Sequence, residues 1–334
     1  MSRALILAPE GGALTADERA FFRDADPWGF ILFRRNVSRP DALRRLTGEL
    51  RAAVGRAAAV FVDQEGGRVA RLGPPHWRSW RPVAEDIARA GDPAEAAEAV
   101  RLRYRLIAHD LTSAGIDGNC VPVLDLPVPG ADPIIGDRAL GTDPATVSRL
   151  GRAAADALLA GGVLPVAKHL PGHGRAPVDS HLALPVVDAP RATLAATDFV
   201  PFRALADLPL GMTAHVVYAA LDDRPATLSK PVIDIIRGEI GFDGLLMTDD
   251  LSMAALEGPM GARAEAALAA GCDVILHCNG NRGEMEAIAA AAPDLSGSAG
   301  ARAARAEAAR SAPEPFDPIA AAARYAALMG EAVP

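Results

Sequence analysis

The sequence lacks any long apolar segment. None of its apolar runs approaches the ~18 residues that a membrane-spanning helix requires. The amino-terminal stretch MSRALILAPEGG has a single arginine, and its apolar run ends at Pro9, which is too short for the apolar core of a signal peptide. We therefore expect a cytoplasmic protein that does not bind membranes.

Cysteine and basic charge are also scarce. The three cysteines, Cys120, Cys272 and Cys278, form no C-x-x-C pair, so we expect neither a disulfide framework nor a zinc knuckle. With 34 basic and 42 acidic side chains the net charge is −8, and neither terminus has a basic block that could neutralise phosphates. Nucleic acid is not an expected partner. No feature of the sequence specifies an oligomer, and a monomer is favoured.

Eight short apolar runs alternate with longer amphipathic segments rich in Ala, Arg, Glu and Asp. This alternation is typical of βα units around a parallel sheet, and eight units suggest a closed (β/α)₈ barrel. The runs are ALILAP from Ala4, GFILF from Gly29, AAVFVD to Asp63, IDGNCVPVLDL to Leu126, VLPVAK to Lys168, LGMTA around Met212, GLLMTD to Asp249 and DVILHC to Cys278. We predict a single α/β domain of the TIM-barrel type over residues 1–334, with Ala/Arg-rich helices from about residue 287 onward.

Capping residues support helices between the runs. Residues 40–54 follow Ser38, and residues 144–159 follow Asp143 and precede a Gly-Gly pair. Ser229 can cap the segment PVIDIIRGEI. We expect a helix at each of these three places.

Polar residues stand at the ends of several predicted strands, where barrel enzymes carry their active sites. The run GLLMTD delivers Asp249, and Asp250 follows it in the motif MTDDLSM. We assign chemistry to Asp249, because the last residue of a rigid strand is well held for attack on a substrate. We expect Asp250 to form the turn and cap the next helix.

A Gly/Pro-rich loop, KHLPGHGRAPVDSH, holds three of the seven histidines. Asp179 and His181 lie two residues apart, a spacing that lets the carboxylate hold one imidazole nitrogen while the other nitrogen faces a substrate. The pair is suited to acid/base catalysis. A surface loop with a structural histidine is the alternative.

The motif DQEGGRVAR contributes Asp63 and Arg71 to the same rim. Together with Lys168 and His169, these side chains could hold a neutral polyol through charge-assisted hydrogen bonds. A simple Asp63–Arg71 salt bridge is the alternative. Arg138, in IIGDRALGTDP, could equally pair with Asp137 next to it.

The assembled motifs resemble those of glycoside hydrolase family 3, and specifically its single-domain β-N-acetylhexosaminidases of the NagZ type, which act in bacterial cell-wall recycling. The resemblance covers roughly residues 3–280, and it rests on motifs in the family's order: DQEGGRVAR, IIGDRALGTDP, KHLPGHG, DSH and TDDLSM. Leu170 stands where Phe is common, and Arg175-Ala176-Pro177 is this chain's version of a variable stretch.

The resemblance implies roles for individual residues. Asp249 would be the nucleophile that forms a glycosyl-enzyme, His181 the general acid/base, and Asp179 the residue that orients His181. The non-reducing N-acetylglucosamine would be bound by Asp63, Arg71, Arg138, Lys168 and His169. His173 would only shape the loop. The implied substrate is a muropeptide, N-acetylglucosamine linked β-1,4 to 1,6-anhydro-N-acetylmuramic acid, and neither cofactor nor metal is expected.

Four alternatives stay open on the sequence. Because an imidazole repels an incoming anion less than a carboxylate does, phosphate could replace water, making the protein a phosphorylase. Lys168 could be a Schiff-base lysine of a barrel aldolase. His173, Asp179 and His181 could bind a catalytic metal. The protein could also bind a sugar without turning it over.

Overall fold

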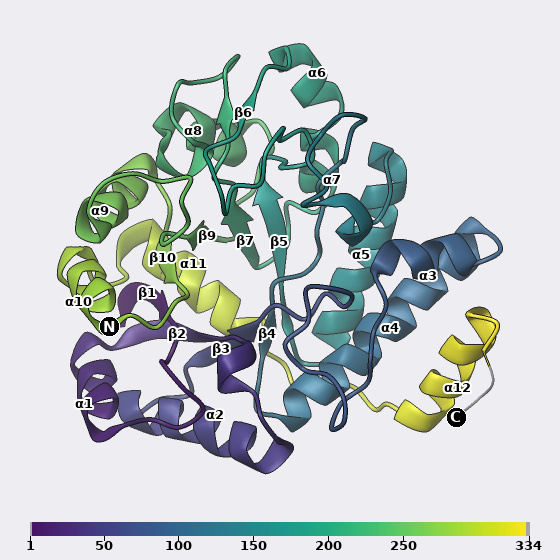
Figure 1. Ribbon diagram of the computed structural model, residues 1–334, viewed down its shortest axis with the longest axis horizontal. Coiled ribbons are helices and arrows are strands. Elements are labelled where there is room, and N and C mark those ends of the chain that lie inside the picture. Colours follow the sequence, from purple (N-terminus) through teal and green to yellow (C-terminus); the bar gives the residue numbers. More distant parts are fainter. Residues whose placement is uncertain (1, 332–334) are drawn as a thin grey trace.

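Eight parallel strands close into a barrel in the computed structural model, which describes residues 2–331 (Figure 1). The order around the barrel is β1-β10-β9-β7-β5-β4-β3-β2. The strands are β1 (Arg3–Leu7), β2 (Pro27–Leu32), β3 (Ala59–Val62), β4 (Gly118–Asn119), β5 (Leu164–Leu170), β7 (Leu210–Thr213), β9 (Leu245–Asp250) and β10 (Val274–His277). Each coincides with one of the eight predicted runs, so the predicted TIM-type barrel is confirmed.

Alternate residues of each strand face the barrel interior and the surrounding helices. In β1, Ile6 belongs to the interior cluster, whereas Leu5 and Leu7 pack in the larger cluster beneath the helices. The interior is filled by side chains and is tight near Gly118, where an added Cβ would lie 2.1 Å from the Phe61 ring. The barrel is therefore a packed core, and space for a ligand lies beyond its strand ends.

Helices surround the barrel in the order expected of βα units (Figure 1). They are α1 (Ala16–Ala25), α2 (Pro40–Val54), α3 (Val83–Arg89), α4 (Pro93–Ser113), α5 (Pro144–Ala160), α6 (Arg191–Ala196), α7 (Phe199–Ala204), α8 (Lys230–Gly238), α9 (Met260–Ala270), α10 (Arg282–Ala291), α11 (Gly297–Ala308) and α12 (Pro318–Leu328). Short 3₁₀ turns occur at Arg34–Asn36, Gly136–Arg138 and Ala226–Leu228, and β6 (Val186–Val187) pairs with β8 (Val217–Tyr218) outside the barrel. Within residues 2–331, no helix is long and apolar enough to cross a membrane.

The three predicted helices are present, but only two have the expected cap. Asp143 accepts a hydrogen bond from the Thr146 amide at the start of α5, and Ser229 accepts one from Val232 at the start of α8. Helix α2 begins at Pro40, with Arg39 at the capping position and no side-chain cap, so Ser38 does not cap it. Proline has no backbone N–H, so a helix that begins with proline has one unsatisfied donor fewer and depends less on a side-chain cap.

The C-terminal helices lie at two different places. Ala303 and Ala306 of α11 join the interior cluster of the barrel, so α11 packs at the end of the barrel where the strands begin. Helix α12 follows an extended linker and lies against α4 (Figure 1). Neither helix covers the end of the barrel where the strands finish, and that end is formed by loops.

Two strands extend further than predicted. β5 continues through His169 to Leu170, and β9 includes Asp250. The prediction that Asp250 caps a helix is wrong, because the next helix, α9, begins only at Met260. The Asp250 carboxylate instead accepts hydrogen bonds from the amide and hydroxyl of Ser252 and from the amide of Cys278. It stabilises a tight turn and ties β9 to the end of β10.

Candidate active site

A cavity of about 150 Å³ opens where the barrel strands end. Seven of the eight predicted site residues line it: Asp63, Arg71, Arg138, Lys168, His169, His181 and Asp249. The eighth, Asp179, does not line the cavity but is hydrogen-bonded to the imidazole ring of His181. Residues from five separate segments of the sequence thus meet at one place, which is the arrangement expected of a barrel enzyme.

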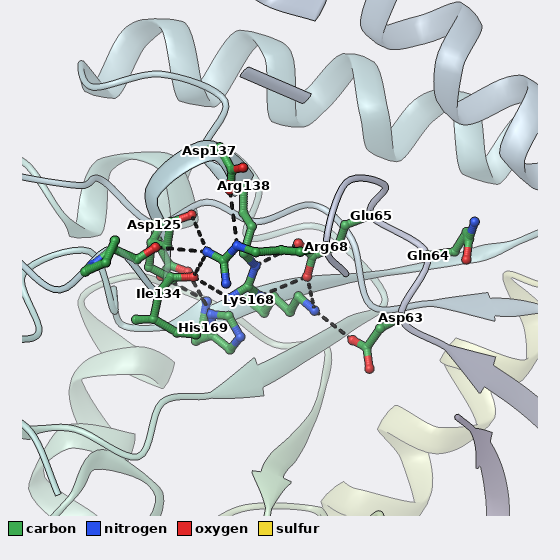
Figure 2. Close-up of polar contacts among 12 residues, drawn as sticks. Asp63, Gln64, Glu65, Arg68, Asp125, Ile134, Asp137, Arg138, Lys168 and His169 are labelled. Atoms are coloured by element: carbon green, nitrogen blue, oxygen red, sulfur yellow. Dashed lines mark hydrogen bonds and ion pairs between the residues drawn. The ribbon is translucent and has the colours of Figure 1, made fainter. Parts of the chain in front are cut away.

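Alternating charges lie at one side of the cavity, in a group that we call the ion-pair cluster: Asp63, Glu65, Arg71, Arg138 and Lys168. Figure 2 shows Asp63, Glu65, Arg138 and Lys168 in contact. The Lys168 Nζ lies 2.8 Å from Asp63 Oδ1 and 2.7 Å from Glu65 Oε1. Glu65 also receives two parallel hydrogen bonds from Arg138, of 2.8 and 2.9 Å. Glu65 therefore fixes both cations at the cavity wall.

Glu65 was not among the predicted site residues. It lies in the DQEGG motif, but its partners Arg138 and Lys168 are far from it in sequence, and no local spacing indicates their contact. The alternative of an Arg138–Asp137 pair is wrong, since Asp137 pairs with Arg68 instead. The Asp63–Arg71 ion pair does form, with a length of 3.1 Å, and both of its members still line the cavity.

The charges of the cluster stabilise one another. Burial alone would lower the pKa of Lys168, but Asp63 and Glu65 outweigh it and raise that pKa above its usual value. Burial likewise acts to raise the pKa of Glu65, yet Arg138 and Lys168 bring it down to about 2. Lys168 is thus held as an ammonium ion, whereas a Schiff-base lysine must lose its proton to attack a carbonyl. The contacts of Lys168 therefore argue against the aldolase alternative.

Arg71 retains donors for a ligand. One of its terminal nitrogens is used by Asp63, and its guanidinium lies 5.1 Å above the Phe33 ring. Its Nε is buried and has no partner among the described residues. Lys168 has a third N–H beyond the two directed at Asp63 and Glu65. Both side chains can therefore donate hydrogen bonds into the cavity.

His169 is oriented by a buried carboxylate that sequence reasoning also missed. Asp125 Oδ2 lies 2.7 Å from His169 Nδ1, and its other oxygen accepts the amides of His169 and His173. With Nδ1 engaged by Asp125, Nε2 is the nitrogen available for a ligand. Asp125 sits in the fourth apolar run, VLDL, and a charged residue inside a buried run is the signal that could have identified it.

Asp249 lies near the end of β9 and faces the cavity. Burial opposes its ionisation, but its pKa lies below the usual value because the rings of His215 and His169 and the amide of Asp250 favour the carboxylate. His215, at the end of β7, is held between Thr227 and the carbonyl of Asp250. Asp249 is thus an ionised carboxylate on a rigid strand, as a nucleophile requires.

A second side of the cavity is formed by the loop of residues 171–185, through His173, Ser180 and His181. His181 Nδ1 lies 2.8 Å from Asp179 Oδ1, which also accepts the His181 amide. Burial acts to raise the pKa of Asp179, yet these hydrogen bonds bring it below its usual value. The predicted Asp179–His181 pair therefore forms, and the carboxylate is positioned to stabilise a protonated imidazole.

His173 lies in the buried first part of this loop, where its amide donates a hydrogen bond to Asp125. Its Nε2 lies 3.0 Å from the Ser180 hydroxyl, and burial together with the nearby His169 lowers its pKa to about 4. In the part of the chain that the structure describes, no three His, Cys, Asp or Glu side chains are grouped as metal ligands. His173, Asp179 and His181, considered above as ligands, are engaged in the contacts with Ser180 and with each other.

Comparison with known proteins gives a consistent result. Residues 8–307 match the family described as Glycosyl hydrolase family 3 N terminal domain. A Beta-hexosaminidase of Alkalilimnicola ehrlichii is 41% identical over 280 residues, 82% of this chain and 80% of that protein. The corresponding enzyme of Chromobacterium violaceum is 42% identical over 291 residues, 85% of this chain and 80% of that protein.

Solved structures agree over nearly the whole length. Native NagZ from Neisseria gonorrhoeae is 32% identical, with a TM-score of 0.86 and 98% of each chain covered. The same protein in complex with N-trifluoroacetyl-D-glucosamine gives a TM-score of 0.87 at 30% identity, again with 98% of each chain covered. Both the sequence and the barrel of the present chain are therefore shared with these proteins.

Proposed function

The chain belongs to glycoside hydrolase family 3 as an enzyme of the β-hexosaminidase type, and from this premise we propose that it is a retaining exo-β-N-acetylglucosaminidase with Asp249 as nucleophile and His181 as general acid/base. The observation that carries this proposal is a single cavity lined both by a half-buried, ionised Asp249 and by an imidazole held by a carboxylate. A retaining glycosidase requires a nucleophile and a proton donor on either side of the scissile bond.

The first step forms a glycosyl-enzyme. The Asp249 carboxylate attacks the anomeric carbon, the bond to the leaving oxygen breaks, and that oxygen takes a proton from His181. In the second step His181 takes a proton from water, the water oxygen attacks the anomeric carbon, and Asp249 is released. Asp179 stabilises the imidazolium form of His181 in each cycle.

The ion-pair cluster supplies the sugar-binding side. Arg71, Arg138 and Lys168 provide N–H donors, and Asp63 provides an acceptor, for the adjacent hydroxyls of a pyranose, while Glu65 holds Arg138 and Lys168 in place. His169 adds a ring nitrogen at the same wall. The N-trifluoroacetyl-D-glucosamine bound to the Neisseria gonorrhoeae relative supports a sugar of the N-acetylglucosamine type here.

The substrate we propose is a muropeptide with terminal N-acetylglucosamine linked β-1,4 to 1,6-anhydro-N-acetylmuramic acid, hydrolysed in the cytoplasm during peptidoglycan recycling. This proposal rests on the motifs that the chain shares with the cell-wall recycling enzymes and on the NagZ structures that match over 98% of the chain. Hydrolysis of purified muropeptide, with release of N-acetylglucosamine, tests it.

The catalytic roles are tested by hydrolysis of a 4-nitrophenyl β-N-acetylglucosaminide, with and without phosphate. We expect the wild type to turn over this substrate at a rate that does not depend on phosphate. In Asp249→Ala we expect kcat to fall at least ~10³-fold, because the covalent route is removed. Asp234→Ala is the matched control, since Asp234 is an exposed aspartate paired only with Lys230 on α8. Stimulation by phosphate with a sugar 1-phosphate as product would indicate the phosphorylase instead.

A further inference from the structure

Arg103 of α4 is fully buried and reaches the ion-pair cluster from behind. Its side chain has 0% exposure and is paired with the equally buried Asp86. Its Nη2 donates hydrogen bonds to the carbonyls of Glu65, at 2.8 Å, and Arg81, at 2.7 Å. Arg103 does not line the cavity, so its contact with the site passes through the backbone of Glu65.

The loop that carries Glu65 is shaped to receive this guanidinium. A Cβ at position 66 would lie 1.8 Å from Arg103 Nη2, so only glycine leaves the space that the guanidinium occupies. Gly66 also has a φ of +101°, a conformation that side chains with a Cβ rarely adopt. The loop geometry and the buried arginine therefore depend on each other.

Helix α12 joins the same network from the C-terminal side. The Tyr325 hydroxyl donates to Asp86 Oδ2 at 2.6 Å, and its ring packs edge-on against Trp80 with 5.4 Å between ring centroids. The Trp80 carbonyl in turn accepts the Gly67 amide at 2.9 Å. Figure 1 shows α12 lying beside α4, far along the chain from the loop that it supports.

We propose that Arg103 and Tyr325 are positioning residues that hold Glu65 in place, and that α12 is thereby a structural part of the sugar-binding site. The path runs from Tyr325 to Asp86, to Arg103 and to the Glu65 backbone. The Glu65 carboxylate then holds Arg138 and Lys168 at the cavity wall. This inference rests on the proposed function, which makes those two cations ligands of the sugar.

The charge state of the network fits this role. Burial would lower the pKa of Arg103, but Tyr104, Asp86 and Tyr325 outweigh it and raise that pKa. Burial and the Asp86 carboxylate raise the pKa of Tyr325, so its hydroxyl keeps the proton that it donates. Removing the Tyr325 hydroxyl leaves the Asp86 carboxylate with one hydrogen-bond donor fewer, and this weakens the Asp86–Arg103 ion pair that holds Arg103 in position.

The experiment compares Tyr325→Phe and Arg103→Met with Arg105→Met. Arg105 is the matched control: it lies on the same helix and ties the same C-terminal segment through Phe316 and the Glu314 carbonyl, but it has no contact with the Glu65 loop. With an aryl β-N-acetylglucosaminide, Tyr325→Phe should raise KM roughly three- to tenfold with a smaller change in kcat. Arg103→Met should raise KM further, and Arg105→Met should leave it unchanged.

A double-mutant cycle separates positioning from general destabilisation. In an Arg138→Met background, Tyr325→Phe should raise KM by a smaller factor than in the wild type, because one of the two cations that Glu65 holds for the sugar is gone. Equal factors in both backgrounds, or an unchanged KM in Tyr325→Phe, would overturn the inference. An unchanged KM in Arg138→Met would instead overturn the proposed role of the cluster in binding sugar.

Discussion

The two sides of the cavity are built differently. In the ion-pair cluster, the side chains of Lys168, Glu65 and Arg138 are 3%, 4% and 9% exposed, and each contacts residues distant in the sequence. On the loop of residues 171–185, the side chain of His181 is 61% exposed and that of Asp179 is 21% exposed. Their bond to each other spans two residues. One side is part of the protein core, and the other lies on its surface.

Under the proposed function, this difference separates sugar binding from proton transfer. The groups proposed to bind the sugar are fixed by buried charges, so a change there should disturb both affinity and stability. The proposed acid/base pair lies on the exposed part of a loop that the Arg175–Asp198 ion pair attaches to the barrel, so a change at His181 should affect chemistry and leave stability unaltered. The start of this loop, residues 171–174, is buried, whereas residues 181–184 are exposed and Leu182 reaches 78% exposure.

The largest effect should come from the loop. His181→Ala should reduce kcat by about 10²- to 10⁴-fold with a poor leaving group, and far less with an activated aryl group that needs no proton. Asp179→Ala should give a smaller version of the same defect. The measurement is kcat across a series of leaving groups, together with chemical denaturation, where His181→Ala should stay within about 0.5 kcal/mol of the wild type. A uniform loss for all leaving groups would contradict the assignment.

The next effect should come from the ion-pair cluster. Glu65→Gln leaves Arg138 and Lys168 without their shared carboxylate, and we expect a loss of about 3 kcal/mol in stability, because buried charges are left unpaired. KM should rise as the two cations lose their fixed positions. Denaturation and steady-state kinetics check both effects, with exposed Glu286→Gln as the matched control. A Glu65→Gln variant with altered kcat but normal KM and normal stability would contradict the assignment of sugar binding to the ion-pair cluster and of chemistry to the loop.

The third effect concerns the junction of the two sides, at His173. Its pKa falls from 6.5 to about 4 in the folded state, so the unfolded chain binds the proton more readily in this interval. Stability should therefore be complete above pH 6.5 and fall as the pH drops toward 4, by about 3 kcal/mol from this group. His173→Gln should flatten that dependence, and exposed His76→Gln should not. An unchanged slope in His173→Gln would mean that another group causes the loss.

Much of the fold follows from local patterns. All eight apolar runs became barrel strands, because a parallel strand buried on both faces reads as a continuous apolar run. Asp143 and Ser229 cap their helices as predicted, since capping depends on residues only a few positions apart. The turn at Asp250 forms as predicted, but the helix cap does not, because a capped helix and a side-chain-bonded turn begin with the same residue types.

The site could be predicted only in part. Residues at strand ends, such as Asp63, Lys168 and Asp249, are brought together by the barrel itself once its eight strands are recognised. Glu65 and Asp125 were missed because their roles depend on partners 73 and 44 residues away. Which carboxylate holds which cation is a matter of tertiary packing, and no short-range spacing encodes it.

The measurement that tests the central claim most directly is the capture of the glycosyl-enzyme. In His181→Ala, an activated aryl β-N-acetylglucosaminide needs no proton for the first step, whereas the second step lacks its base, so the intermediate should accumulate. Intact mass spectrometry should then show one added N-acetylhexosaminyl group, and peptide mapping should place it on Asp249. A label on Asp250 or another residue, or an α-anomeric first product with no labelled enzyme, would contradict the account.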